Sequence, residues 1–186
     1  MSNSKKNNVK YIAVITLKLL LISTVTALLL SGVNALTEEK IAENAEAEKR
    51  AAISEIFGDG IATEIYSESL SGITELYLVT KDGAPAGYAA QVAPLGFGGE
   101  MTVMVGVAED GTVAGVKLIA HSETPGLGNR VGETAHTSKY IGQSADSLHV
   151  DAITGSTISS NALRSGVEAA LSVYSTVCGS TNGGAE

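Results

Sequence analysis

The segment between Tyr11 and Leu36 constrains this chain most, because almost all of its side chains are apolar or small. A helix across it would be about 39 Å long at about 1.5 Å per residue. The hydrocarbon core of a bilayer is about 30 Å thick, so such a helix can cross it with some tilt. Lys18 is charged, but its side chain can reach the amino-side surface or face a partner helix. The sequence therefore predicts a membrane-spanning helix over residues 11–36.

A cleaved secretory signal is the alternative interpretation of the same segment. Small residues at Val33-Asn34-Ala35 suit a signal peptidase. The apolar run is longer than the roughly 7–15 residues of an ordinary signal core, which favours the anchor.

Charge divides the chain at the same place. Four of the 12 basic residues and none of the 20 acidic ones precede position 37, so the remainder holds 8 basic against 20 acidic residues. Lysines before an anchor favour the cytoplasmic side, so we expect a cytoplasmic segment 1–10 and an extracytoplasmic acidic domain. An acidic body repels phosphates, which excludes nucleic acid as a partner. The lone Cys178 excludes an internal disulfide or a multi-cysteine iron–sulfur site.

The pattern after the anchor predicts an α+β domain. A juxtamembrane helix is expected over 37–60, with Thr37 as its cap and Gly58-Asp59-Gly60 at its end. Two antiparallel hairpins follow, with turns at Asp82-Gly83 and Glu109-Asp110-Gly111. A last helix after Thr157 has an apolar face. The expected domain spans 61–178, and 179–186 is expected to be a disordered tail.

A loop of small hydroxyl residues runs from Asp151 to Ser160 and ends where the last helix should begin. Gly155 lets the backbone bend, and free amides at a helix start suit a phosphate. The Thr157 hydroxyl could then be bonded to that phosphate. An ordinary Thr- and Ser-rich capping loop explains the same residues without a ligand.

A second loop, His121-Ser122-Glu123-Thr124-Pro125-Gly126-Leu127-Gly128, leaves a predicted strand. Its proline and glycines would hold backbone amides in fixed directions and let a flat ring come close. A solvent-facing loop is the alternative.

These segments, in this order behind an anchor, resemble one family. The leader helix, Gly96-Phe97-Gly98-Gly99, the loop at 121–128 and Asp151-Ala152-Ile153-Thr154-Gly155-Ser156-Thr157 are similar to the FMN-binding G subunit of the Rnf electron-transport complex. The C subunit of the sodium-pumping NADH:quinone reductase is a close relative. Ser156 stands where alanine is more usual in the family.

The resemblance implies FMN joined through its phosphate to the Thr157 hydroxyl, by a flavin transferase that uses FAD and a divalent metal. It also implies a recognition loop before Thr157 and a loop against the flavin. The implied cofactor-binding residues are Thr157, Asp151, Thr154, Gly155, Ser156, Glu123, Thr124, Gly126, Leu127 and Gly128. The chain would be an electron carrier beside other membrane and iron–sulfur subunits of an ion-translocating ferredoxin:NAD oxidoreductase, in a bacterial or archaeal cytoplasmic membrane.

Three alternatives stay open. One is a component like the C subunit of the quinone reductase, although this chain lacks a long insertion before its hairpins. Another is a non-redox, membrane-anchored ligand-binding or scaffold domain. The third is a metal site, but the spacing of His121, Glu123, His136 and His149 matches no familiar zinc pattern. We expect no catalytic residues and no turnover by the isolated protein.

Overall fold

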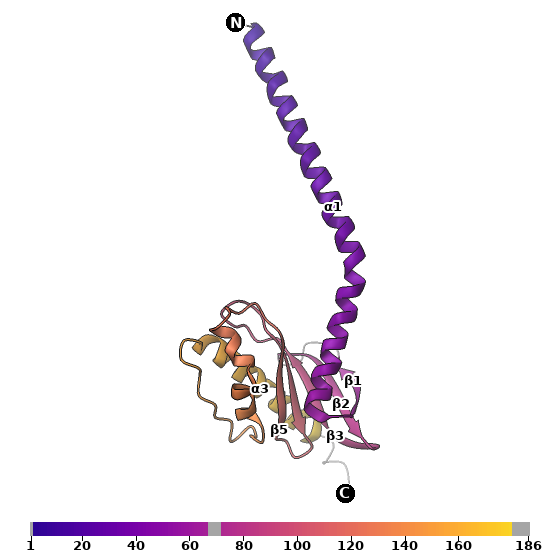
Figure 1. The fold of residues 1–186 in the computed structure, drawn as a ribbon, viewed down its shortest axis with the longest axis vertical. Coiled ribbons are helices and arrows are strands. Elements are labelled where there is room, and N and C mark those ends of the chain that lie inside the picture. Colours follow the sequence, from indigo (N-terminus) through magenta and orange to yellow (C-terminus); the bar gives the residue numbers. More distant parts are fainter. Residues whose placement is uncertain (1, 67–71, 180–186) are drawn as a thin grey trace. The chain divides into compact units, whose positions relative to one another are not determined.

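The computed structural model describes residues 2–66 and 72–179 (Figure 1). The chain divides into two compact units, residues 1–46 and 47–186. One helix, α1 (Ser2–Phe57), belongs to both, because it continues through the boundary between them.

Within the first unit, α1 exposes apolar side chains all around its surface, as Leu20, Leu21 and Ile22 illustrate. The helix is long and apolar enough to cross a membrane, judged by length and composition. Three threonine hydroxyls inside the apolar stretch, those of Thr16, Thr24 and Thr26, donate to the carbonyl four residues earlier, at 3.0, 2.8 and 2.9 Å. Such bonds satisfy a hydroxyl without water. This segment fits a single-pass membrane protein.

The expected helix start at Thr37 is wrong. The helix runs unbroken through this position, and the Thr37 hydroxyl donates to the carbonyl oxygens of Val33 and Asn34, at 3.0 and 3.3 Å. Its side chain bonds back to the preceding turn instead of capping a new one, as threonines inside helices do. Where a bilayer would begin and end along α1 stays a prediction.

The second unit is built on one antiparallel sheet in the order β1-β2-β3-β4-β5 (Figure 1). Its strands are β1 (Ile61–Tyr66), β2 (Ile73–Lys81), β3 (Ala84–Val92), β4 (Thr102–Ala108) and β5 (Val113–Ala120). The predicted hairpins β2–β3 and β4–β5 are confirmed, with Asp82 and Gly83 at φ 53° and 81°, as a tight two-residue turn requires. Strand β1 was not predicted. The α+β fold class is confirmed.

Helices cover both faces of this sheet. The long helix α3 (Thr157–Gly179) lies on one face, where its Leu163 and Val167 pack with Val103 and Val105 of β4. The last turns of α1 cover the other face, where Ala52, Ile53, Tyr77, Val79, Ala89 and Met104 are buried together. Successive side chains of a strand point to opposite faces. A strand buried on both faces is therefore apolar throughout, as β4 is from position 103 to position 107.

The end of α1 approaches the sheet closely. A Cβ atom added to Gly106 would lie 2.4 Å from Cγ2 of Ile56, and one added to Gly115 would lie 3.1 Å from the same side chain. Two ion pairs link the same helix end to the sheet, Lys49 with Glu75 at 2.9 Å and Lys117 with Glu55 at 2.7 Å. Gly106 of β4 and Gly115 of β5 carry no side chains, and this makes room for the end of α1 against the sheet.

Between β5 and α3 the chain makes the short helices η1 (Gly128–Gly132), α2 (Thr134–Thr137) and η2 (Ser138–Tyr140). His136 is buried with both ring nitrogens unpartnered, and its ring meets Tyr140 edge to face. Burial lowers the pKa of His136, with a smaller contribution from Lys139, and burial raises the pKa of Tyr140 to about 12. Of the expected tail, Gly179 ends α3, and residues 180–186 lie outside the described part.

Candidate functional site

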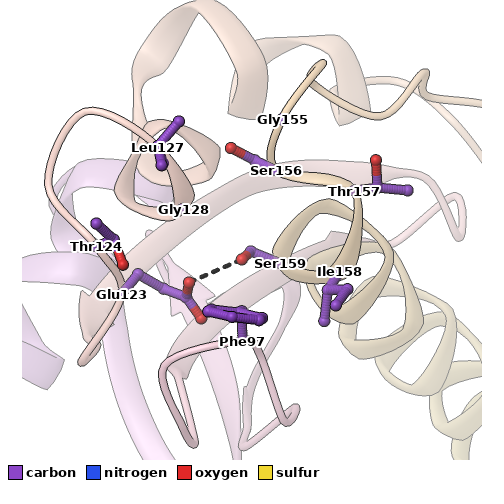
Figure 2. A pocket seen from close by; sticks show the side chains of 10 residues that line it. All are labelled: Phe97, Glu123, Thr124, Leu127, Gly128, Gly155, Ser156, Thr157, Ile158 and Ser159. Carbon is purple, nitrogen blue, oxygen red and sulfur yellow. Dashed lines mark hydrogen bonds between the residues drawn. The ribbon is translucent and has the colours of Figure 1, made fainter.

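A cavity of about 390 Å³ lies where three segments meet, far apart in sequence (Figure 2). One segment is the glycine-rich loop between β3 and β4, the second is the loop after β5, and the third is the start of α3. Its ten lining residues are Phe97, Glu123, Thr124, Leu127, Gly128, Gly155, Ser156, Thr157, Ile158 and Ser159. Seven of the ten residues that sequence reasoning singled out are thus brought together in one cavity.

Backbone bonds give the first two segments their shape. The Gly96 N–H donates to the Gly99 carbonyl at 2.8 Å, which closes the turn that carries Phe97. The Gly126 N–H donates to Oδ1 of Asn129 at 2.7 Å, at a φ of 77° that favours glycine. The Leu127 N–H donates to the Thr124 carbonyl at 3.1 Å. Both loops are therefore tightly turned.

The buried carboxylate of Glu123 joins all three segments. Its Oε1 accepts from the Gly98 N–H at 3.0 Å. Its Oε2 accepts from the Ser159 hydroxyl at 2.8 Å, as Figure 2 shows. The Glu123 N–H in turn donates to Nδ1 of His121 at 3.2 Å. The side chain is only 5% exposed. A buried carboxylate requires such partners, so Glu123 is a structural centre of the site.

The start of α3 places Thr157 at the cavity. Gly155 has a φ of 84°, and the Ser156 N–H donates to the Ile153 carbonyl at 2.9 Å, which turns the chain into the helix. The first bond along the helix runs from the Ser160 N–H to the Ser156 carbonyl, at 2.9 Å. Thr157 is the first residue of α3 and is exposed. The N–H groups of a first helical turn have no partner inside the helix, so they are free for an anion.

Ser156 carries an orphaned polar atom. Its hydroxyl oxygen is buried and makes no hydrogen bond, although Ser156 lines the cavity. Three exposed apolar side chains stand on the same lining, Phe97, Leu127 and Ile158 (Figure 2). The cavity therefore combines an apolar wall with a helix start, and it can hold a ligand that has a flat apolar part and an anionic part.

Three predicted site residues do not line the cavity. Asp151 and Thr154 are exposed on the approach to α3, and Oδ1 of Asp151 lies 3.6 Å from Nε2 of His149. Gly126 shapes the second loop without lining the cavity. The candidate metal ligands do not converge: His121 accepts the Glu123 N–H, and His136 is buried against Tyr140. Within residues 10–63 and 72–174, no three His, Cys, Asp or Glu side chains are placed to hold a metal ion.

Sequence reasoning did not name Phe97, Ile158 and Ser159 as site residues. Phe97 has a signal that could have found it, because an aromatic residue flanked by glycines interrupts both the strand and the helix pattern. Ser159 has none, since only folding brings its hydroxyl to Glu123, 36 residues earlier.

Two family models match the chain. Residues 8–56 match the RnfG N-terminal region, and residues 96–172 match the FMN-binding domain. The second match includes all ten residues that line the cavity. The match at 8–56 favours the Rnf protein over its quinone reductase relative.

Individual relatives agree. The G subunit of the Na(+)-translocating ferredoxin:NAD(+) oxidoreductase complex of Acetobacterium woodii is 34% identical over 128 residues, 61% of each chain. The G subunit of the ion-translocating oxidoreductase complex of Pasteurella multocida is 29% identical over 154 residues, 77% of this chain and 76% of that protein. The match thus spans about three fifths of the Acetobacterium protein.

Among solved structures, the C subunit of the Na(+)-translocating NADH-quinone reductase of Parabacteroides distasonis is similar. It has 20% identity and a TM-score of 0.47, over 69% of this chain and 81% of that chain. The chain is therefore similar to the G subunits of Rnf complexes, with an RnfG N-terminal region and an FMN-binding domain matched in this order.

Proposed function

We propose that this protein is the flavin-carrying electron-transfer subunit of a membrane-bound, ion-translocating ferredoxin:NAD oxidoreductase complex, with FMN linked through its phosphate to Thr157. The observation that carries the proposal is the position of Thr157, the exposed first residue of a long helix in the lining of the cavity. The relatives from Acetobacterium and Pasteurella are named as subunits of such complexes. Other membrane and iron–sulfur subunits would then be its partners.

The residues present fit FMN. A cavity of about 390 Å³ is within the usual range of small-molecule sites, about 300–1,000 Å³. The apolar side chains of Phe97, Leu127 and Ile158 suit a flat ring system. Free amides at the start of α3 suit a phosphate, and the orphaned Ser156 hydroxyl can donate to a polar group of the ligand.

Attachment requires access to the Thr157 hydroxyl, and its exposure supplies that access. A flavin transferase would move FMN from FAD: the Thr157 oxygen forms a bond to the FMN phosphorus, the pyrophosphate bond of FAD breaks, AMP leaves, and the hydroxyl proton goes to a base. The transferase would hold the divalent metal. The exposed Asp151 and Thr154 precede the helix and would form part of the surface that the transferase recognises.

Bound FMN supplies a carrier that can hold one or two electrons, which links one-electron and two-electron partners. The protein's own groups would bind and orient it: the apolar wall excludes water from one side of the ring, and the start of α3 holds the phosphate. Turnover would need the other subunits, which receive electrons from ferredoxin and pass them to NAD.

The membrane segment supports a definite orientation. Lys10 and the lysines before it favour a cytoplasmic amino terminus, which would place residues 47–186 outside the cytoplasm. A covalent tether would then keep the flavin from being lost to the surroundings.

The test is co-expression with a flavin transferase, followed by a denaturing gel read for flavin fluorescence and by intact mass. The wild-type band should fluoresce and carry the added mass of one FMN. Thr157→Ala should abolish both signals, while Thr134→Ala, at another exposed helix start, should keep them. A dark wild-type band, or a fluorescent Thr157→Ala band, would contradict the proposal.

A further inference from the structure

The Glu123 carboxylate is enclosed more tightly than its two hydrogen bonds require. A Cβ atom added to Gly96 would lie 2.1 Å from Oε1, and one added to Gly128 would lie 2.0 Å from Oε2. Both distances are far inside van der Waals contact. Residues with side chains could not occupy these positions unless the carboxylate moved. The two loops therefore close directly around this one group.

The charge of Glu123 is only partly compensated. Its partners are one backbone N–H and one hydroxyl, at 3.0 and 2.8 Å. Both donate, which suits an ionised carboxylate. Among the residues whose side chains the structure describes, no basic group forms an ion pair with it. Glu75 on the sheet differs, because its carboxylate pairs with Lys49 at 2.9 Å. A charge without a counter-charge acts over a longer range.

We propose that Glu123 is a positioning residue whose buried negative charge makes the cavity favour oxidised over reduced FMN. The inference rests on the proposed function, because it needs FMN in this cavity. Its carboxylate holds the glycine loop that carries Phe97 against the first turn of α3, and its charge lies in the lining of the same cavity.

The sign follows from charge balance. Uptake of two electrons and one proton converts oxidised FMN into its reduced form with one more negative charge; the electrons come from the reducing partner and the proton from water. Like charges repel, so a carboxylate in the lining disfavours the reduced form. At a separation of several ångströms and an intermediate dielectric constant, the effect on the ratio of the two affinities is about tenfold.

The experiment is an FMN titration of the full-length protein in detergent, made without flavin transferase so that no FMN is attached. Dissociation constants are measured for oxidised FMN, and for dithionite-reduced FMN without oxygen. Glu123→Gln keeps one acceptor for Gly98 and places an amide beside Ser159, so it removes the charge and little else. It should bind reduced FMN about tenfold more favourably, relative to oxidised FMN, than the wild type does. For a two-electron couple a tenfold change corresponds to about 30 mV.

Two variants separate the charge of Glu123 from other effects. Glu75→Gln neutralises a carboxylate that does not line the cavity, and should leave the ratio unchanged. Thr124→Lys adds a cation to the cavity with both Glu123 bonds in place, and should shift the ratio as Glu123→Gln does.

An unchanged ratio in Glu123→Gln overturns the inference, as does an equal shift in Glu75→Gln. If Glu123→Gln does not fold, Thr124→Lys decides, and an unchanged ratio there overturns it. If wild-type protein binds no free FMN in either state, this inference fails, while the gel test of covalent attachment still decides the proposed function. The two can fail separately. If the wild-type gel band fluoresces, the Thr157→Ala band is dark and the affinity ratio does not change in Glu123→Gln, only the inference fails.

Discussion

The two long helices, α1 and α3, are both rich in apolar residues, yet they use them in opposite ways. In α3 the apolar residues Leu163, Val167 and Leu171 recur every four positions and are buried on the sheet. In the stretch of α1 between 11 and 36 they occur on every side and remain exposed. A helical stripe indicates a face that packs on a core, and an all-round apolar surface indicates a nonpolar solvent. Residues 47–57 of α1 change to the first behaviour within the same helix.

The largest expected effect tests whether the exposed apolar stretch of α1 lies in a membrane. Leu21→Lys with Val25→Lys puts two charges inside the apolar stretch, at a cost of about 2.5–3.5 kcal/mol each near the bilayer centre. The protein should leave the membrane fraction after a carbonate wash. Ile41→Lys with Ala45→Lys, at the same spacing but outside the stretch, should stay. Membrane retention of the first pair would show that the stretch is not a membrane anchor.

The same truncation, leucine to alanine, in each of the two helices tests whether only the apolar side chains of α3 pack in a core. Leu163→Ala removes a fully buried side chain and should lower the free energy of unfolding of the domain by about 2–5 kcal/mol. Leu20→Ala removes an exposed one from α1 and should leave that free energy unchanged. Urea unfolding in detergent, followed by tyrosine fluorescence, measures both. Equal effects of the two changes would contradict the contrast.

The end of α1 can be tested where it touches the sheet. Gly106→Ala places a methyl group 2.4 Å from Ile56 and should cost about 1–3 kcal/mol of unfolding free energy. Ile56→Ala should restore part of that loss in the double variant, because it removes the contacted methyl group. A strictly additive double-mutant cycle would mean that the helix end does not pack there.

The smallest expected effect is a loss of folding stability at low pH, and we expect it to come from the core under α3. His136 packs edge to face on Tyr140, which belongs to the core under α3. Burial lowers the pKa of His136, so the unfolded chain binds the proton more readily than the folded one. The stabilising contribution is present above the ordinary histidine pKa, about 6.5, and is lost as pH falls through the folded value.

The melting temperature should therefore fall on acidification below about pH 6.5. His136→Phe keeps an aromatic ring at this position and should show a shallower decrease over the same range. An equal slope in both proteins would assign the acid sensitivity to other groups.

Much of the fold could be predicted from sequence pattern. The turn residues Asp82-Gly83 and the alternating strands beside them specify a hairpin locally. The apolar stripe after Thr157 likewise marks a helix whatever its partner is. Strand β1, Ile-Ala-Thr-Glu-Ile-Tyr, was not predicted because it lies at the edge of the sheet and pairs on one side only. The alternation of apolar and polar residues along it is therefore weak. The unbroken α1 escaped because Thr37 reads equally well as a cap and as an interior residue.

For the site, the two motifs predicted two loops that the structure brings to one cavity, but not the residues that these loops contact. The sequence by itself determined an apolar segment long enough to cross a membrane, an acidic α+β domain, and a hydroxyl loop that leads into a helix with Thr157 at its start. Each of these depends on residues that are neighbours along the chain. Only the tertiary structure decided that Phe97, Glu123 and Ser159 meet in one cavity, and that glycines at 96 and 128 close around a single carboxylate. The physical reason is that these contacts join residues 25 and 36 positions apart, whose approach depends on how the whole sheet packs against α3.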